Sequence, residues 1–359
     1  MALSNKKILF FNYESLNSSN GVSTFIRRLM HRLPNSKGIS FINKRNYQPI
    51  KSEVNIRSKS FLGELIMGKS GFTRINMEIF NSELVHINMD NFYSILIALI
   101  CRWHKKPTVF SIHSNLINSG GIKGLLNRIR TTIVHNFLVL INELSFWSTR
   151  SQLNIFKKFT LLKRRFIKRS VVLPNFIEDS IIRKNSQKRF SEIIFVGRYT
   201  KMKGFYDILQ LASDCKDISF GIIGGNLENA KDFKNINDYG VIDYNKILSF
   251  YDKSSLFILP SYTEVFPMTI LEAMARGLVI LVSDIPGMRE IVKEGRNGYL
   301  FPPGDINKMK ELILNLKNNP KEVERISKKN LKDIWNFTAE KQIPKYVKVY
   351  EDVLKNVKK

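Results

Sequence analysis

The chain has 359 residues, of which 43% are hydrophobic and 25% are charged. This length suits two domains of roughly 150 to 180 residues, and the composition excludes an intrinsically disordered protein. The longest nearly apolar run, residues 92–103, contains Ser94 and Arg102 and is too short to cross a membrane, so we expect no membrane-spanning helix.

Positive charge is concentrated in the first half of the chain. The formal net charge is +26, and residues 1–175 hold 27 lysines and arginines against 7 aspartates and glutamates, a net charge of +20. Such a field attracts phosphates, anionic lipid headgroups or nucleic acid. A lysine-rich genome would give the same surplus without any binding role.

Cys101 and Cys215 are far apart in the sequence and form neither a disulfide framework nor a zinc motif, which favours a reducing compartment. The first apolar run turns polar at Asn12, so it is too short for a signal peptide and is predicted to be a strand. We therefore expect a cytoplasmic protein.

Short apolar runs alternate with longer mixed segments along the whole chain, which is typical of βα units in parallel sheets. In the first half we expect strands at residues 7–12, 39–43, 84–88, 108–113 and 171–175, and helices at 22–33, 92–103 and 123–143. In the second half we expect strands at 192–197, 218–224, 256–260 and 278–283.

This pattern predicts an α/β protein with two Rossmann-like domains that face each other. The polar segment 177–190, which follows Pro174 and Asn175, is predicted to be the linker between them. Residues 342–359 carry apolar side chains at helical spacing and are predicted to end the chain as an amphipathic helix.

Two cations flank the loop that follows the strand at 192–197. Arg198 comes directly after Gly197, and Lys203 precedes Gly204 and a predicted helix. Ligands of open α/β sheets bind at the carboxyl ends of the strands, and a guanidinium with an ammonium at that place suits a diphosphate. The alternative is a pair of solvated cations in a chain with 57 lysines and arginines.

Two glutamates, Glu264 and Glu272, flank a turn that opens a helix after the strand at 256–260. The unpaired amides of a helix start attract phosphate, and carboxylates beside them accept hydrogen bonds from sugar hydroxyls, so this stretch suits a nucleotide sugar. For Glu272 the alternative is a capping box with Thr269. For Glu264 the alternative is a solvated loop acid.

The order of these residues resembles a known family. Gly-Arg-x4-Lys-Gly at 197–204, Glu-x7-Glu at 264–272 and Glu-Ala-Met-Ala-Arg-Gly at 272–277 are similar to the retaining GT-B glycosyltransferases of glycosyltransferase family 4, also called glycosyl transferases group 1. The stretches 283–292 and 297–305 continue the pattern. The resemblance is strong over residues 172–305 and thin in the first half.

The resemblance implies the GT-B fold. Residues 1–176 would form an N-terminal acceptor-binding domain and residues 177–340 a C-terminal donor-binding domain, with a deep cleft between them. The helix at 341–359 would return to the N-terminal domain.

The resemblance also implies roles for single residues and a mechanism without a metal or other cofactor. Arg198 and Lys203 would bind the donor diphosphate and act in catalysis, Glu264 would bind the transferred sugar, and Glu272 the nucleotide ribose. No cluster of residues in the sequence has metal-ligand spacing. The residues whose backbone amides would reach the sugar and its phosphate are Phe266, Met268 and Thr269.

The chain departs from the family pattern at two places. Val265 and Pro267 stand where the family usually has glycines, and Pro267 cannot donate an N–H to the sugar. Phe176 replaces the glycine of the usual Pro-Asn-Gly, which removes a permissive turn residue. Neither change affects a charged residue.

Two residues of the first half are candidates by their position. Gly21 follows the first strand where the family often has two glycines, and it would let the backbone approach the donor, although Asn20 replaces its companion. His113 ends the strand at 108–113 and would act as a catalytic residue by hydrogen bonding to the sugar or the acceptor. The alternatives are that Gly21 is an ordinary loop glycine and that His113 only makes hydrogen bonds to neighbouring backbone.

The basic segment 157–169 alternates seven cations with apolar residues, which suits an anionic membrane surface. Further cations are expected to extend the same face, namely Arg27, Arg28, Arg32, Arg128 and Arg130. The alternatives are a solvated helix face and, third in order because no binding module accompanies the charge, nucleic acid.

The sequence thus predicts a hexosyltransferase-like enzyme that moves a sugar from a UDP- or GDP-sugar to a glycan. The expected acceptor is a lipid-linked precursor of cell-surface polysaccharide or lipopolysaccharide, used by a peripheral protein at the inner face of the cytoplasmic membrane. The alternatives on the same fold are a sugar-nucleotide epimerase, a glycosyltransferase with a soluble acceptor, and a non-catalytic protein that binds an anionic membrane or RNA. The presence of Arg198, Lys203, Glu264 and Glu272 together favours the transferase.

Overall fold

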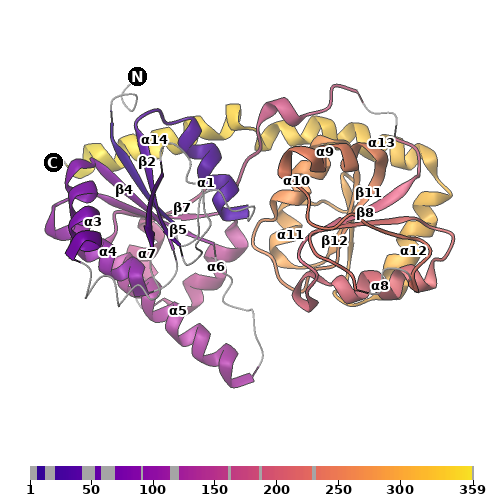
Figure 1. Cartoon of the computed structure of the whole chain (residues 1–359), viewed down its shortest axis with the longest axis horizontal. Coiled ribbons are helices and arrows are strands. Elements are labelled where there is room, and N and C mark those ends of the chain that lie inside the picture. The colour runs from indigo at the N-terminus through magenta and orange to yellow at the C-terminus, as the bar shows by residue number, and fades with distance from the viewer. Residues whose placement is uncertain are drawn as a thin grey trace. The chain divides into compact units, whose positions relative to one another are not determined.

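The computed structural model describes residues 6–12, 21–42, 53–57, 69–89, 92–113, 121–160, 163–185, 188–228 and 232–357. The chain forms two compact units (Figure 1). The N-terminal unit comprises Met1–Pro174 and Gln342–Lys359, and the C-terminal unit comprises Asn175–Lys341. Each unit has its own parallel sheet with helices packed on it.

The sheet of the N-terminal unit has the strand order β3-β2-β1-β4-β5-β6-β7, and all neighbouring strands are parallel. The order reverses between β1 and β4, which is the doubly wound arrangement. The strands are β1 (Ile8–Asn12), β2 (Ser36–Ile42), β3 (Glu53–Arg57), β4 (Leu84–Asn88), β5 (Thr108–Ile112), β6 (Leu144–Trp147) and β7 (Ser170–Val172).

Helices cover both faces of this sheet. They are α1 (Gly21–His31), α3 (Lys69–Asn81), α4 (Phe92–Trp103), α5 (Gly121–Ile141), α6 (Arg150–Phe159), α7 (Lys163–Lys168) and, from Gln342 onward, α14 (Ala339–Val357). None of the described helices is both long enough and apolar enough to span a bilayer.

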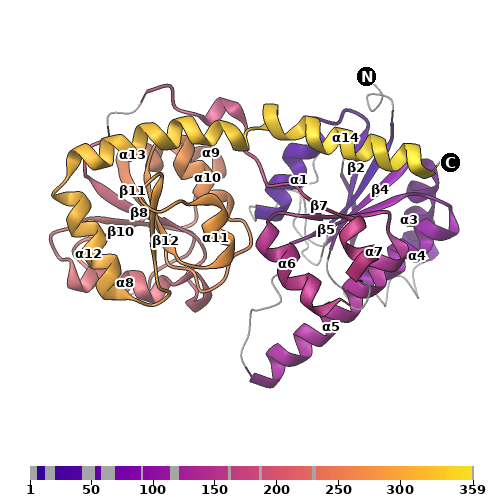
Figure 2. The ribbon, with the colours of Figure 1, turned by 180° about the vertical axis from the view of Figure 1, so that it is seen from behind.

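The alternation of side chains along the strands separates these helices into two layers. Leu9 and Phe11 of β1 belong to the core that α3 to α7 cover. Phe10, between them, packs against His86, whose ring in turn contacts Tyr350 of α14. Helix α1 shares this second layer with α14, as Figures 1 and 2 show.

The C-terminal unit has the strand order β10-β9-β8-β11-β12-β13, again parallel throughout, and the order reverses between β8 and β11. The strands are β8 (Glu192–Val196), β9 (Phe220–Ile223), β10 (Ile236–Asp238), β11 (Ser254–Leu259), β12 (Val279–Ser283) and β13 (Gly298–Phe301). The helices are α8 (Phe205–Asp214), α9 (Tyr244–Lys253), α10 (Met268–Ala275), α11 (Pro286–Ile291), α12 (Ile306–Lys317) and α13 (Pro320–Asp333), with 3₁₀ turns η1 (Asp179–Ile181), η2 (Lys201–Lys203) and η4 (Ile334–Phe337).

The apolar pattern predicts most of the described strands and misses four. Residues 84–88 and 92–103 match β4 and α4 residue for residue, and every other predicted strand overlaps an observed one. The prediction omits β3, β6, β10 and β13. Three of these lie at sheet edges and β6 has only four residues, so they lack the long apolar runs of central strands.

The predicted linker at 177–190 is wrong, because this segment belongs to the C-terminal unit. Ile177 and Ile181 lie in the core of that unit, and Lys188 is 6% exposed. The sequence does not show whether a lysine is solvated or buried against carbonyl groups. The polar composition of this segment therefore predicted an exposed linker, although the segment packs into the C-terminal unit.

Lys188 is expected to be important for stability. Its ammonium donates hydrogen bonds to carbonyl oxygens at the end of α9, those of Tyr251 (2.9 Å), Asp252 (2.8 Å) and Ser254. Burial lowers the pKa of Lys188 to about 8, so the group is still mostly charged at neutral pH. Lys188→Met removes this donor and should lower the free energy of unfolding by about 3 kcal/mol in urea denaturation.

The control for this variant is Lys184→Met in the same segment, where the side chain is exposed. We expect it to change the free energy of unfolding by less than about 0.5 kcal/mol. Equal losses in the two variants would show that the buried hydrogen bonds of Lys188 do not matter.

The basic residues of α1 do not extend the surface of residues 157–169, so this expectation is wrong. Arg28 is 7% exposed. Helix α1 packs with α14, on the face of the sheet opposite α6 and α7. The side chain of Arg128 lies outside the described ones. A run of cations in a sequence does not show which face of a sheet its helix covers.

Candidate functional site

The candidate site lies at the carboxyl ends of β8 and β11. These strands are neighbours at the point where the strand order of the C-terminal unit reverses. At such a point the connections lead away to opposite faces, which leaves room for a ligand. The loop after β8 carries Arg198 and Lys203, and the loop after β11 carries Glu264 and leads into α10.

Gly204 allows these two loops to lie close together. Its φ is 69°, and a Cβ at this position would lie 2.1 Å from the carbonyl oxygen of Pro260. Only glycine fits such an approach and such a backbone conformation. The amide of Tyr262 also donates a hydrogen bond to the carbonyl of Met202 at 3.0 Å. The cations after β8 are therefore fixed beside the loop after β11.

Lys203 and Glu264 form an ion pair that joins the two loops. Their side chains are 25% and 11% exposed, so water screens the pair only in part. Glu264 also accepts a hydrogen bond from the hydroxyl of Ser261 at 3.2 Å. An anionic ligand at this edge would compete with Glu264 for the ammonium, and Glu264 could then accept hydrogen bonds from hydroxyl groups. Arg198 is exposed at the start of the same loop.

The start of α10 offers hydrogen-bond donors beside this pair. Pro267 precedes the first helical residue and makes no side-chain capping bond. Among the described residues, the amides of Met268 and Thr269 have no backbone acceptor. Such amides and the positive end of the helix dipole attract phosphate. Phe266, the third residue with a predicted amide contact, is 7% exposed in the loop just before.

Glu272 is not part of a capping box, so that alternative is wrong. Thr269 is the second residue of α10 and follows the helix cap, Pro267. Glu272 lies one turn into the helix and is 4% exposed. Burial, and after it the charge of Glu272, raises the pKa of the Tyr251 phenol well above its usual value. The Glu272 carboxylate therefore lies in the interior of the C-terminal unit, near enough to Tyr251 for its charge to act on the phenol.

Two residues outside the predicted set position the loop with Glu264. The side-chain amide of Asn175 donates to the carbonyl of Phe266 at 3.2 Å. A Cβ on Gly287, in the first turn of α11, would lie 2.4 Å from the carbonyl oxygen of Val265 and 2.7 Å from that of Glu264. Their sequence signals are the Pro174-Asn175 pair and the stretch 283–292, but neither signal says which loop the residue contacts.

The loop after β9 supports the other side of the β8 loop. Tyr199 stacks on Phe205 with ring centroids 4.1 Å apart and donates a hydrogen bond to Asp238 at 2.7 Å. A Cβ on Gly225 would lie 2.4 Å from the Tyr199 ring, and one on Gly224 would lie 2.4 Å from the carbonyl oxygen of Gly197. The sequence signal for this contact is the pair of successive glycines at the end of a strand.

The remaining two candidates belong to the N-terminal unit. Gly21 is the first residue of α1, and Asn20 lies outside the described residues. His113 follows β5, is half-buried and has its ring centroid 6.2 Å from that of Phe25. His86, by contrast, is a core residue whose ring contacts the hydroxyls of Tyr350 at 2.7 Å and Ser111 at 2.6 Å. Burial and the charge of His113 hold the pKa of His86 well below its usual value.

Comparisons with known proteins find similarity to glycosyltransferases. The family model described as "Glycosyl transferases group 1" matches residues 177–333. Over 193 residues the chain is 30% identical to an uncharacterized glycosyltransferase of Methanocaldococcus jannaschii, which covers 52% of this chain and 54% of that protein. Over 172 residues it is 28% identical to the N,N'-diacetylbacillosaminyl-diphospho-undecaprenol alpha-1,3-N-acetylgalactosaminyltransferase of Campylobacter jejuni, 46% of each chain. The chain thus spans about half the length of the curated relatives it matches.

A solved structure resembles the chain along nearly its whole length. HepE of Anabaena, in complex with UDP and glucose, matches with a TM-score of 0.79 and 14% identity over 97% of this chain and 100% of that chain. At this identity the likeness shows the fold, and it confirms the predicted α/β fold of GT-B type.

Proposed function

We propose, from the glycosyl transferases group 1 domain that this chain contains at residues 177–333, that the protein is a glycosyltransferase. Its donor is a nucleotide diphosphate sugar, a UDP- or GDP-sugar, and its acceptor is a glycan. The observation that carries the proposal is the meeting of Lys203, Glu264 and the start of α10 at one edge of the sheet. The UDP and glucose in the similar HepE structure support the donor class.

Each charged residue of the site has a separate role in this proposal. Arg198 and Lys203 bind the diphosphate together with the amides of Met268 and Thr269, because these groups supply positive charge at one place. Glu264 accepts hydrogen bonds from the transferred sugar. Glu272 binds the ribose, and the backbone amide of Phe266 makes a further contact to the sugar.

The transfer retains the configuration of the anomeric carbon. The bond from that carbon to the diphosphate oxygen breaks, a bond to the acceptor oxygen forms on the same face, and the acceptor proton passes to the leaving phosphate. Arg198, Lys203 and the start of α10 stabilise the charge that grows on the diphosphate. His113 hydrogen-bonds the sugar or the acceptor, and Gly21 lets the backbone approach the donor.

The mechanism uses no metal ion in this proposal. In its place Arg198, Lys203 and the dipole of α10 would supply the positive charge that a metal would bring to the diphosphate. In the part of the chain that the structure describes, no three His, Cys, Asp or Glu side chains form a group that could hold a metal ion.

The acceptor in this proposal is a lipid-linked precursor of cell-surface polysaccharide or lipopolysaccharide. The protein would meet it as a peripheral enzyme at the inner face of the cytoplasmic membrane. The name of the Campylobacter jejuni relative specifies a diphospho-undecaprenol acceptor, which supports this class. The surplus of positive charge in the first half of the chain suits an anionic lipid surface.

A panel of nucleotide sugars tests the donor class. The purified protein is incubated with UDP-, GDP-, ADP- and CMP-sugars, and its melting temperature and slow donor hydrolysis are measured. We expect a UDP- or GDP-sugar to raise the melting temperature, as any ligand of the folded state does. If none of the four raised the melting temperature or was hydrolysed, the proposal would be wrong.

Gly287→Ala is expected to reduce donor hydrolysis by about a hundredfold, because the new methyl group displaces the carbonyls of Val265 and Glu264 and misplaces the Glu264 carboxylate. Gly295→Ala is the control, since an added Cβ meets nothing within 4 Å at Gly295. Gly295 has a φ of 67°, which Gly287 does not share, so the control carries the backbone strain of a glycine replacement without the clash. Similar losses of hydrolysis in both variants would indicate a general cost of replacing glycine.

A further inference from the structure

Large apolar side chains that are exposed gather on one helical layer of the N-terminal unit. Among the described residues there are fifteen such side chains, and ten of them lie on α3 to α7, whereas none lies on α1 or α14. The ten are Phe72, Met77, Phe80, Leu99, Trp103, Ile129, Ile133, Leu140, Phe159 and Ile167. An exposed apolar set confined to one face indicates an interaction site.

The most exposed members show that this set is not the edge of the core. Trp103 at the end of α4 is 86% exposed, and Phe80 and Met77 near the end of α3 are 63% and 58% exposed. On α5 the outward positions Ile129 and Ile133 are one helical turn apart, which makes them part of a stripe along the outer side of that helix. The inward side of α5 supplies other residues to the core.

Specific contacts join the helices of this layer. The Phe80 ring lies 5.8 Å from the ring of His104 and has the Lys106 ammonium 5.6 Å from its centroid, so the ends of α3 and α4 meet. Arg165 of α7 donates a hydrogen bond to the carbonyl of Leu140 at 2.8 Å, so α7 meets the end of α5. Helix α5 also packs against α4, and α6 against α7, so the exposed apolar side chains lie on one connected face.

The same five helices carry almost pure positive charge. They contain thirteen lysines and arginines and one acidic residue, Glu78, which is paired with Lys37. Like charges crowd together on this face. Burial lowers the pKa of Arg169, and Arg165 and Arg102 beside it lower that pKa as well.

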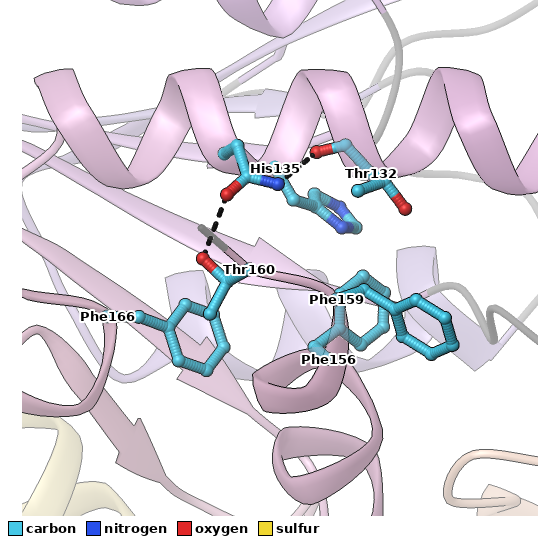
Figure 3. Close-up of a pocket in the computed structure, with 7 residues that line it drawn as sticks. Thr132, His135, Phe156, Phe159, Thr160 and Phe166 are labelled. Carbon is cyan, nitrogen blue, oxygen red and sulfur yellow. Dashed lines mark hydrogen bonds between the residues drawn. The ribbon is translucent and has the colours of Figure 1, made fainter. Parts of the chain in front are cut away.

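A pocket within this layer is too small to hold a lipid headgroup. It lies between α5, α6 and α7, below the ring of His135, as Figure 3 shows, and it admits about one water molecule. Thr160 donates to Asn136 at 2.9 Å, and Asn136 donates to the carbonyl of Thr132 at 2.8 Å. Binding at this layer therefore uses the outer face of the helices.

We propose that the outer face of α3 to α7 is a docking surface for an anionic lipid bilayer. Exposed apolar side chains enter the boundary between headgroups and acyl chains, and the surrounding cations pair with anionic headgroups. A second copy of the chain is a poorer occupant because it would bring two strongly positive faces together. The proposal rests on the membrane association proposed above and places it on α3 to α5 as well as on residues 157–169.

Co-sedimentation of the full chain with vesicles tests this docking surface. We expect binding to vesicles of phosphatidylcholine with phosphatidylglycerol, little binding to phosphatidylcholine alone, and weaker binding as salt is added. Trp103→Ser combined with Met77→Ser should weaken the binding by about tenfold or more, because it removes apolar side-chain area that the bilayer would cover. The combined Lys157→Gln, Lys158→Gln and Lys163→Gln variant should weaken it by about a hundredfold.

The matched control is Tyr206→Ser with Val241→Ser, which removes two apolar side chains of 60% and 80% exposure from the C-terminal unit. It should bind anionic vesicles like the parent chain. All these variants should hydrolyse a nucleotide sugar normally without vesicles, which separates a failure of docking from a failure of the proposed activity.

Three results would overturn the docking surface. They are equal binding to neutral and anionic vesicles, unchanged vesicle binding of the Trp103 and Met77 variant, and no vesicle binding at all. Self-association that the same variant abolished would instead make this face an interface between copies.

Discussion

Lys203→Ala is expected to reduce transfer from the nucleotide sugar by about a thousandfold. The loss has two causes. The variant removes the cation that, in the proposed mechanism, stabilises the leaving diphosphate. It also leaves the Glu264 carboxylate, 11% exposed, without its ionic partner beside the proposed diphosphate site. Steady-state kinetics should show a lower kcat together with a higher KM for the donor.

Lys201→Ala is the matched control for this variant. Lys201 lies two residues away in the same 3₁₀ turn and is exposed. It should turn over the donor within about twofold of the parent chain, because an exposed charge away from the ligand is strongly screened. Near-normal turnover of Lys203→Ala, or equal losses at both positions, would contradict the role of Lys203.

Glu272→Gln should weaken binding of the nucleoside diphosphate by about 10- to 100-fold, because a hydrogen bond to a charged carboxylate contributes about 1.5–3 kcal/mol. The amide has the same shape as the carboxylate, so the packing around this residue, which is 4% exposed, is kept. Calorimetric titration with UDP or GDP measures the effect. Glu272→Ala should in addition cut transfer severely.

The role in ribose binding requires a selective loss. Binding of a sugar 1-phosphate, which lacks the ribose, should be nearly unchanged in Glu272→Gln. Glu340→Gln, at an exposed position, should bind both ligands normally. If Glu272→Gln bound the nucleotide as tightly as the parent chain, or lost both ligands together with its cooperative melting transition, its role would be structural.

The sequence predicts the parts of the site that follow from local patterns. Arg198 and Lys203 lie in the loop after a strongly apolar strand, and Glu264 follows another, so both loops could be placed at the carboxyl edge of a sheet. The helix at 92–103 could be predicted residue for residue, because a long apolar run with clear ends leaves few alternatives. The shorter strand at 84–88 could be predicted as well.

Contacts between distant residues could not be predicted from the sequence. Lys203 and Glu264 are 61 positions apart, and nothing local indicates that their charges pair. The carbonyls that Gly287 lies against, and the carbonyl that Asn175 binds, likewise depend on how separate loops meet. Such contacts follow from the folded strand order and from close packing, which a single sequence does not encode in any short stretch.

Local patterns also led to wrong predictions where burial decides the outcome. The Thr269 and Glu272 spacing matches a capping box, but the helix begins before Thr269. The segment around Lys188 is polar, but the lysine is buried against carbonyl groups. Arg28 is one of several cations on α1, but it packs into the protein. In each case the residue type alone does not show whether the side chain is exposed or buried.

The central claim is that the protein breaks the bond between the sugar and the diphosphate of a nucleotide sugar. Phosphorus NMR of the reaction with the donor chosen from the panel tests this directly, together with proton NMR of the sugar. We predict release of a nucleoside diphosphate and a sugar product with the anomeric configuration of the donor. Release of a nucleoside monophosphate with a sugar 1-phosphate, or a changed sugar still attached to its nucleotide, would contradict the account.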